Sequence, residues 1–198
     1  MARNRQFFSS FEEFVLSAES RGMTCPEFAQ EIGIEECGVY VVLTGDGKFR
    51  FFDRKSEIPC PFGFEVSWRI GEYVQENHVE AVTIPEGVSS VGDGAFFECT
   101  SLTSVSIPNS VTRIGMEAFA GCTSLRSVSI SNFVRRIGDW TFSGCTSLRS
   151  VTIPESVTKI GGWAFFGCTS LRNIVLPKRF ADVMSRFLDR QTKISFHK

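Results

Sequence analysis

Apolar and polar residues follow one another in an order that returns at a fixed interval through the second half of the chain. Leu102, Val105, Ile107 and Pro108 begin one unit, and the same residue types recur 23 positions later. Four such units run without insertion over residues 82–173. A fixed period between about 20 and 50 residues is typical of a solenoid, in which each unit forms one coil. We therefore expect a solenoid over this stretch.

The start of each unit predicts a short strand. Val105 and Ile107 lie on one side of this strand, and Ser104 and Ser106 lie on the other, because side chains alternate along extended backbone. Pro108 lacks an N–H group and therefore ends the ladder of hydrogen bonds.

The rest of each unit predicts a second short extended segment, here residues 111–114, and then a return to the interior through Ala118, Phe119 and Cys122. Gly115 indicates either a positive φ or a crowded backbone. One coil cannot enclose a core, so neighbouring coils must bury each other's apolar rows. The rows expected inside are Leu102/Leu125/Leu148/Leu171, Ile84/Ile107/Ile130/Ile153, Val91/Ile114/Ile137/Ile160, Phe96/Phe119/Phe142/Phe165 and Cys99/Cys122/Cys145/Cys168.

The cysteine row allows two interpretations. Adjacent rungs of a parallel ladder lie about 4.8 Å apart, which is near enough for a disulfide. A stacked row, however, points its side chains in parallel, and a free Cys packs as a small hydrophobic residue. We therefore expect reduced, buried thiols here rather than a redox or metal site.

The full motif of the unit is L-x-x-[VI]-x-I-P-x-x-V-x-x-I-G-x-x-[AT]-F-x-x-C-T-S, seen at 102–124, 125–147 and 148–170. With this motif, residues 82–177 resemble the BspA-type leucine-rich repeat family. The resemblance implies a curved solenoid of parallel strands on a concave face, and a binding role, often adhesion to or recognition of other proteins. The Asn of other leucine-rich repeats is absent at the corresponding Gly87, Ser110, Phe133 and Ser156, so no Asn ladder is expected.

Residues 1–79 predict a small α+β domain. Ser9 and Ser10 precede acidic residues in the pattern of a helix start, and Gly22 suits the position after its end. A second helix is expected over 24–33. The β-rich segments 39–43 and 49–52 flank a Gly-rich turn and predict a hairpin.

The two ends of the solenoid are each expected to carry a cap. Val66, Ile70 and Val74 have helical spacing and predict a helix over the first coil. After the half repeat 174–177, the apolar spacing of 180–187 predicts a capping helix, and 194–196 predicts a last short strand. The expected domains are therefore 1–79, a solenoid over 80–177, and a C-terminal cap over 178–198.

The net charge of −1 is unevenly distributed along the chain. The counts of basic and acidic residues are 8 and 14 in residues 1–81, 7 and 6 in 82–173, and 6 and 2 in 174–198. The acidic N-terminal part opposes binding to nucleic acid. The short basic tail is explained equally well by a solvated helix face.

Location is predicted from the absence of two signals. Glu12 and Glu13 interrupt the only apolar segment that could serve as a secretory signal, and no run approaches the length of a membrane span. With an odd number of cysteines, these features favour the cytoplasm. Export without a cleaved signal, or a surface location as in related families, is the alternative.

The sequence offers no constellation that demands catalysis. Its two histidines, His78 and His197, stand beside no evident nucleophile, and a pairing of His78 with Cys60 has nothing further to support it. Cys25, Cys37 and Cys60 lack a compact zinc spacing. We therefore expect no catalytic residue, no metal site, no cofactor and no small-molecule substrate.

Two outward rows are basic, and the strands between them carry hydroxyls. The expected concave face carries Ser104, Ser106, Ser127, Ser129, Ser150 and Thr152. The basic rows are Arg113/Arg136/Lys159 and Arg126/Arg149/Arg172. They are either spaced charges for solubility or a site for an acidic or phosphate-bearing partner.

The third unit departs from its siblings by carrying Phe133 and Arg135 where small polar residues are usual, next to Arg136 of the basic row. Trp140 occupies a position held by Gly94 and Glu117, and Trp163 repeats it one unit later. Aromatic and Arg side chains on a surface have the composition of a binding hot spot. The site prediction is one outward patch of Phe133, Arg135, Arg136, Trp140 and Trp163. The alternative is that the Trp rings only shield a turn.

These observations favour a non-enzymatic module that binds a protein partner through the solenoid surface. The alternative is a nucleic-acid-associated or regulatory protein that uses the N-terminal helices and the basic rows.

Overall fold

The fold is taken from a computed structural model of the chain. It describes residues 11–24, 29, 34–36, 39–43, 49–52, 56–58, 64–76, 78–184, 188 and 192–197. The expected turn over 44–48, the loop over 59–63, most of the second helix and Cys25, Cys37 and Cys60 lie outside these residues.

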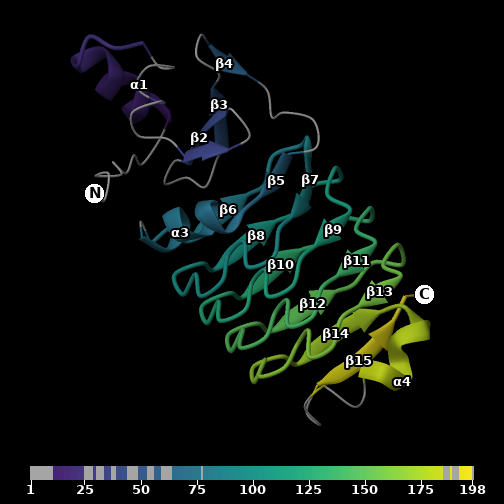
Figure 1. Cartoon of the computed structure of the whole chain (residues 1–198). Coiled ribbons are helices and arrows are strands. Elements are labelled where there is room, and N and C mark those ends of the chain that lie inside the picture. The colour runs from purple at the N-terminus through teal and green to yellow at the C-terminus, as the bar shows by residue number, and fades with distance from the viewer. Residues whose placement is uncertain are drawn as a thin grey trace.

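Two ladders of parallel strands run along a solenoid, one on each side of its coils (Figure 1). The first ladder forms two three-stranded sheets, β6 Ala81–Thr83, β8 Ser104–Ser106 and β10 Ser127–Ser129, then β12 Ser150–Thr152, β14 Asn173–Leu176 and β15 Lys193–Phe196. The second is one sheet of β5 Phe64–Val66, β7 Val88–Val91, β9 Arg113–Ile114, β11 Arg136–Ile137 and β13 Lys159–Ile160. The solenoid is confirmed.

The strand register reproduces the period of the sequence. Val82 pairs with Val105 and Val105 with Val128, while Ile114 pairs with Ile137 and Ile137 with Ile160. Identical positions of successive units therefore stand directly above one another. The alternation within the strands is also as expected, since Val105 is buried between Ser104, which is half-buried, and Ser106, which is exposed.

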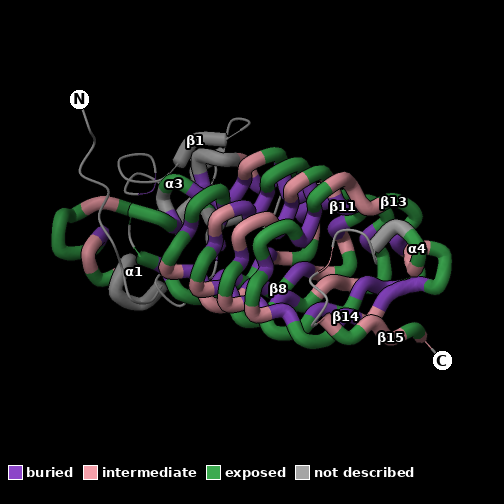
Figure 2. Tube along the Cα trace, turned by 90° about the horizontal axis from the view of Figure 1, so that it is seen from below, coloured by how far each residue is buried: buried purple, intermediate pink, exposed green. Residues whose placement is uncertain are grey.

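The apolar rows line the inside of every coil, and the exposed residues lie outside (Figure 2). Phe96, Phe119, Phe142 and Phe165 are buried and stack almost parallel, with ring centroids 5.2, 5.4 and 5.3 Å apart. The Leu row is buried throughout, and only Ile130 and Ile160 among the expected Ile and Val positions are half-buried. These rows confirm the predicted core.

The glycine after each second strand is required by close approach of the backbones. A Cβ at Gly138 would lie 2.5 Å from the carbonyl carbon of Gly115, and one at Gly161 would lie 2.3 Å from the backbone nitrogen of Asp139. No side chain fits at such distances. Of the two explanations for this row, crowding is therefore the one that applies.

The N-terminal end of the solenoid differs from expectation at one residue. Val66 belongs to strand β5, which pairs in parallel with β7, so its predicted place in a helix is wrong. Helix α3 begins later, at Trp68, and ends at Glu76, with Ile70 and Val74 buried in the solenoid core. Strand pairing therefore overrode the helical spacing of Val66, while the rest of the helix covers the first coil.

Ahead of this coil, the described residues include helix α1 and a small antiparallel sheet. Helix α1 spans Phe11–Ser20, and Gly22 follows with a positive φ of 67°. The sheet contains β1 Ile34–Glu36, β2 Val39–Leu43, β3 Phe49–Phe52 and β4 Glu57–Ile58 in that order. The predicted hairpin is confirmed by the antiparallel pairing of β2 with β3.

At the other end, the chain leaves β14 through the 3₁₀ helix η1 Lys178–Phe180 and the short helix α4 Ala181–Met184. It then returns as β15, which pairs in parallel with β14, so the last predicted strand is confirmed. The Arg179 guanidinium donates to the carbonyl oxygens of Glu155 and Val157 and binds the Glu155 carboxylate at 3.1 Å. These contacts hold the C-terminal segment against the solenoid.

The Phe row predicts a large difference between two Phe→Ala changes. Phe119→Ala should lower the free energy of unfolding by about 3–5 kcal/mol, because the ring lies buried between two others. Phe133→Ala removes an equal volume from a side chain that is 56% exposed and should cost less than about 0.5 kcal/mol. Chemical denaturation of both variants checks this, and equal melting of Phe119→Ala and wild type would contradict the row.

Candidate functional site

The turn after each second strand presents the two tryptophans of the predicted patch. Trp140 and Trp163 stack with centroids 5.2 Å apart and an interplanar angle of 14°. Trp140 is half-buried, whereas Trp163 is 46% exposed. The rings therefore bury part of each other and leave an outer aromatic face.

The backbone explains why this position accepts such different residues. Gly94, Glu117, Trp140 and Trp163 all have a positive φ, between 53° and 63°. This left-handed turn directs the side chain away from the core, so packing in the core does not limit the size of the side chain. The variability from Gly to Trp that marked the position in the sequence follows from this geometry.

The other three residues of the predicted patch are exposed, but Phe133 and Arg135 precede strand β11 and Arg136 is its first residue. Phe133 is in the turn before β11, with its N–H group 3.4 Å from the Ser131 Oγ, while Trp140 is in the turn after it. Arg135 and Arg136 are also exposed. Within the continuously described stretch 78–184, the ring contacts of Trp140 are with Trp163 and Phe166 and do not include Phe133.

Phe166 is a member of the aromatic cluster that the sequence analysis missed. Its ring meets Trp140 edge-on at 5.9 Å, and it is 54% exposed. Because this contact joins residues of two different units, no spacing within one unit indicated it. Phe97 and Met116, on earlier coils, are exposed as well, at 45% and 46%. We call Trp140, Trp163 and Phe166 the aromatic cluster.

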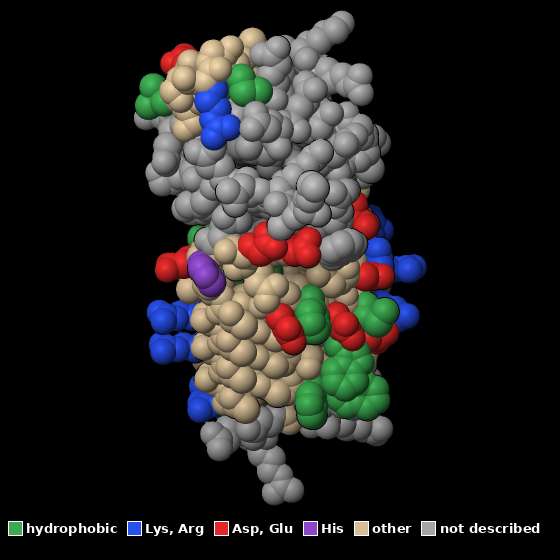
Figure 3. All heavy atoms as spheres, turned by 60° about the vertical axis from the view of Figure 1, so that its left-hand side comes forward, with side chains coloured by type: hydrophobic (Ala, Val, Ile, Leu, Met, Phe, Trp, Pro, Cys, Tyr) green, Lys and Arg blue, Asp and Glu red, His purple; other side chains and the backbone are tan. Residues whose placement is uncertain are grey.

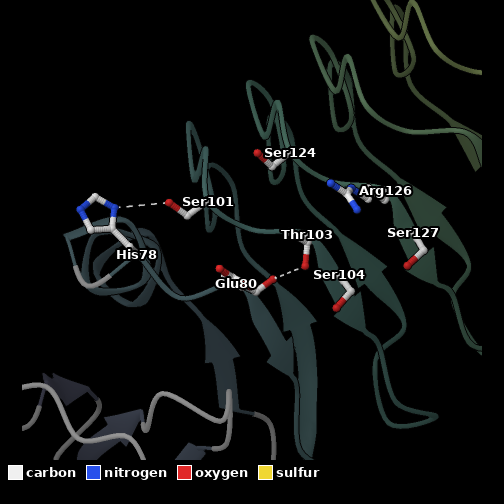
Figure 4. Close-up of a pocket in the computed structure, with 8 residues that line it drawn as sticks. All are labelled: His78, Glu80, Ser101, Thr103, Ser104, Ser124, Arg126 and Ser127. Atoms are coloured by element: carbon white, nitrogen blue, oxygen red, sulfur yellow. Dashed lines mark hydrogen bonds between the residues drawn. The ribbon is translucent and has the colours of Figure 1, made fainter.

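A second surface carries the hydroxyl groups of the first ladder, and Ser106, Ser127, Ser129, Ser150 and Thr152 are exposed there as predicted. A shallow pocket of about 570 Å³ opens at its N-terminal end (Figure 4). Its lining is polar: His78, Glu80, Ser101, Thr103, Ser104, Ser124, Arg126 and Ser127. His78 Nδ1 lies 3.3 Å from the Ser101 Oγ, and the Thr103 hydroxyl donates to the Glu80 carbonyl oxygen at 2.8 Å.

Seen from the turns, uncharged polar surface lies between two differently charged borders (Figure 3). Lys and Arg side chains form a column along one edge, below a His and an acidic side chain, while acidic, apolar and further Lys and Arg side chains lie toward the other edge (Figure 3). The two candidate surfaces, the hydroxyl-bearing ladder and the aromatic cluster, therefore have different electrostatic surroundings.

The family follows from the repeats. Residues 69–195 match the BspA type leucine rich repeat region in six copies. The chain belongs to this family. The match extends beyond the four regular units of this BspA-type solenoid and includes most of β15, which pairs with β14.

Solved structures share the fold of this BspA-type protein. A leucine-rich repeat protein from Bacteroides ovatus is 35% identical over 61% of this chain and 37% of its own, with a TM-score of 0.53. A leucine rich cell surface protein from Faecalibacterium prausnitzii is 26% identical over 82% of this chain and 39% of its own, with a TM-score of 0.52. The chain thus spans less than two fifths of the length of either. No match was found among curated proteins.

Neither a metal site nor a membrane-spanning helix is found among the described residues of this BspA-type protein. Among them, no group of three His, Cys, Asp or Glu side chains could hold a metal ion. In the same part of the chain, no helix has the length and apolar character that crossing a bilayer requires. His78 lies at the surface beside Ser101, and the ring of His197 donates from Nε2 to the Ile153 carbonyl oxygen at 2.7 Å.

The cysteine row is bonded to the Phe row of the preceding coil. The Cys122, Cys145 and Cys168 thiols donate to the carbonyl oxygens of Phe96, Phe119 and Phe142 at 3.1, 3.2 and 3.1 Å, and the Cys99 thiol donates to Gly71 at 3.3 Å. All four are buried free thiols. Their geometry agrees with the predicted packing role.

Burial also makes these thiols poor acids. Loss of hydration raises the pKa of Cys99 and of Cys168 to about 12, from an ordinary 9.0. The pKa values of Cys122 and Cys145 are raised further, by burial first and by neighbouring thiols second. Since the thiolate is the nucleophile, these cysteines are chemically inert in the folded protein.

The number of free thiols tests the row. Protein purified without reductant and then denatured should show all seven of its cysteines as titratable thiols. In the folded state at pH 8, the four repeat cysteines should resist iodoacetamide because they remain protonated. Finding only three thiols after denaturation would mean two disulfides in the row.

The raised thiol pKa values also predict how stability depends on pH. The unfolded thiol loses its proton above about pH 8.5, whereas the folded thiol of Cys168 keeps it until about pH 12. The unfolded state therefore binds fewer protons in this window, and the free energy of unfolding falls as pH rises. In Cys168→Ala the fall should be smaller by up to about 1.4 kcal/mol per pH unit. Identical slopes in denaturation curves from pH 9 to 11 would contradict the burial of this thiol.

Proposed function

We propose that the chain is a non-enzymatic module that binds a protein partner through its solenoid surface. The observation that carries this proposal is the exposed aromatic cluster of a leucine-rich repeat protein, since such proteins commonly mediate protein interactions. Aromatic side chains at the surface supply large contact area with little loss of conformational entropy.

The contact surface proposed for the partner comprises Phe133, Arg135, Arg136, Trp140 and Trp163. Exposure of Phe133 and of both Arg side chains supports it, as does the outward turn that carries the Trp pair. Because strand β11 separates Phe133 from Trp140, the partner must extend across this strand to contact both sides. Phe166 is added to the surface through its contact with Trp140.

The domain division proposed with this function is an α+β domain over residues 1–79, a solenoid over 80–177 and a C-terminal cap over 178–198. Helix α3 and strand β5 connect the first two of these domains closely. By sequence they belong to residues 1–79, but they pack against the first coil of the solenoid. Arg179 supports the C-terminal cap through its bonds to the coil containing Glu155 and Val157.

The compartment proposed for the protein is the reducing cytoplasm. The odd number of cysteines and the free thiols of the cysteine row support it, because disulfides are typical of oxidising compartments. The cell surface protein from Faecalibacterium prausnitzii represents the alternative location. The thiol count described above separates the two.

The aromatic contact surface is tested with a double variant. Trp140→Ala with Trp163→Ala should weaken binding to the partner by at least about 2 kcal/mol, because the rings would lie at the centre of the interface. The melting temperature should stay nearly unchanged, since both side chains leave the core at an outward turn. The partner is first captured from cells of the source organism, and its affinity is then measured by titration calorimetry.

Two controls accompany this experiment. Phe97→Ala with Met116→Ala removes exposed apolar surface of the same face from earlier coils and should leave the affinity unchanged. A solenoid with its third unit replaced by the second should lose the partner during capture. Loss of folding together with binding in the Trp variant would favour the shielding role, and an unchanged affinity would remove the patch as the contact surface.

A further inference from the structure

Arg126, Arg149 and Arg172 form a column at the edge of the hydroxyl-bearing ladder, which we call the arginine column. Each stands immediately before the first residue of its strand, on β10, β12 and β14, and all three are exposed. Backbone hydrogen bonds hold neighbouring coils together here, as from the Arg172 N–H group to the Arg149 carbonyl oxygen at 2.9 Å. The three side chains therefore start one rung apart.

The arginine column crosses coils whose hydroxyl-bearing side carries few acidic residues. Four segments on this side, 99–108, 122–131, 145–154 and 168–177, contain the three arginines and no Asp or Glu, whereas the rung of β6 carries Glu80, which lines the same pocket as Arg126. Glu80 occupies the same place in the unit but two rungs before Arg126. Lys193 extends the basic edge beyond Arg172, because it pairs with Asn173 on the next rung.

The other basic row differs because it begins with a compensated charge. Arg113 binds the Asp93 carboxylate at 2.7 Å and lies 3.9 Å from that of Glu65. Within the described stretch 78–184, no salt bridge reaches any member of the arginine column. The Arg172 guanidinium donates to the Thr169 carbonyl oxygen at 3.0 Å.

Like charges one rung apart repel each other, and neighbouring rungs of a sheet lie about 4.8 Å apart. Such a distance is shorter than the screening length of about 8 Å at physiological ionic strength. Among the described residues of these four segments, no carboxylate offsets the repulsion. A negatively charged partner would offset it and would gain charge-assisted, bidentate hydrogen bonds from the guanidinium groups.

The spacing of the column discriminates between shapes of such a partner. Three arginines span about 9.6 Å at 4.8 Å per rung. On an α-helix, residues i, i+3 and i+7 advance by about 4.5 and 10.5 Å along the axis, close to this spacing. On an extended strand, three successive side chains of one face span about 13 Å, which does not match the span of the three arginines.

The adjoining surface leaves room for a helix. Serine and threonine side chains are short, and the polar pocket beside Arg126 lowers the surface further at its N-terminal end (Figure 4). Their hydroxyl groups can donate to carboxylates that the arginines do not reach. The apolar side chains seen in this view gather toward the other border of the turns (Figure 3).

From this charge and spacing we infer that the arginine column binds an acidic α-helix of a protein partner, with carboxylates at i, i+3 and i+7 facing Arg126, Arg149 and Arg172. The inference rests on the proposed protein-binding function and adds a second surface, with a stated chemistry, to it. It does not require the aromatic cluster, so each surface has its own test.

The experiment uses a synthetic helical peptide with Glu at i, i+3, i+4 and i+7, no aromatic residue other than a terminal fluorophore, and a scrambled peptide that spreads the same charges around the helix. Binding to the full chain is measured by fluorescence anisotropy at 50 and 150 mM salt. The patterned peptide should bind at least about tenfold more tightly than the scrambled one, and more weakly at the higher salt.

The matched variants each remove three positive charges. Arg126→Gln, Arg149→Gln and Arg172→Gln together should weaken binding of the patterned peptide at least about tenfold. Arg135→Gln, Arg136→Gln and Lys159→Gln together should change it less than about twofold, since these residues lie on the other ladder. Circular dichroism confirms folding, and Arg149→Gln alone replaces the triple variant if that variant melts early.

Several results would overturn the inference. Equal binding of the patterned and scrambled peptides would show that helix spacing is not recognised. An equal loss of affinity in the two triple variants would show that net charge, and not the position of the arginines, determines binding. Tighter binding of a duplex DNA of equal charge, lost in the same column variant, would make the column a nucleic-acid site. The Trp140→Ala, Trp163→Ala variant should bind the peptide as wild type does, so a failed peptide test leaves the aromatic proposal standing.

Discussion

Each coil of this solenoid completes its backbone hydrogen bonds through the coils beside it. The Phe119 N–H group donates forward to the Thr141 carbonyl oxygen at 2.8 Å, and the Gly138 N–H group donates back to that of Ile114 at 2.9 Å. These bonds exist only if successive units have the same length. A one-residue insertion would break these hydrogen bonds along a whole coil. It would also move the buried residues of a strand to the surface and the exposed ones to the core. The unvarying period of the sequence is therefore a physical requirement of the fold.

This requirement explains why so much of the fold was predictable. Once Phe96, Phe119 and Phe142 occupy the same place in their units, stacking of coils must bring their rings together. The hairpin was predictable for a local reason, because two β-rich segments lie on either side of a short Gly-rich stretch of sequence. Val66 was misassigned because its helical spacing with Ile70 is a local signal, while its pairing with β7 depends on a strand distant in sequence.

The candidate site was predictable only in part. Exposure of Trp140 and Trp163 followed from the range of residues at their position, but Phe166 entered through a turn geometry that no spacing rule had flagged. Phe133 and Trp140 were grouped by their nearness in sequence, yet strand β11 lies between them. The distribution of charge on the hydroxyl-bearing side could be interpreted only once the structure showed which segments form that side.

The left-handed turn beneath the tryptophans has a consequence for how the chain balances folding against surface chemistry. Glycine adopts a positive φ without a steric penalty, and Gly94 does so in the first unit, whereas a residue with a Cβ is strained there. Trp140 and Trp163 thus occupy backbone sites where a smaller residue would suit the coil better. The solenoid tolerates these rings because each coil is supported from both sides. Because neighbouring coils hold each turn rigidly, a turn of the solenoid can present side chains that an isolated loop of the same sequence could not hold in place.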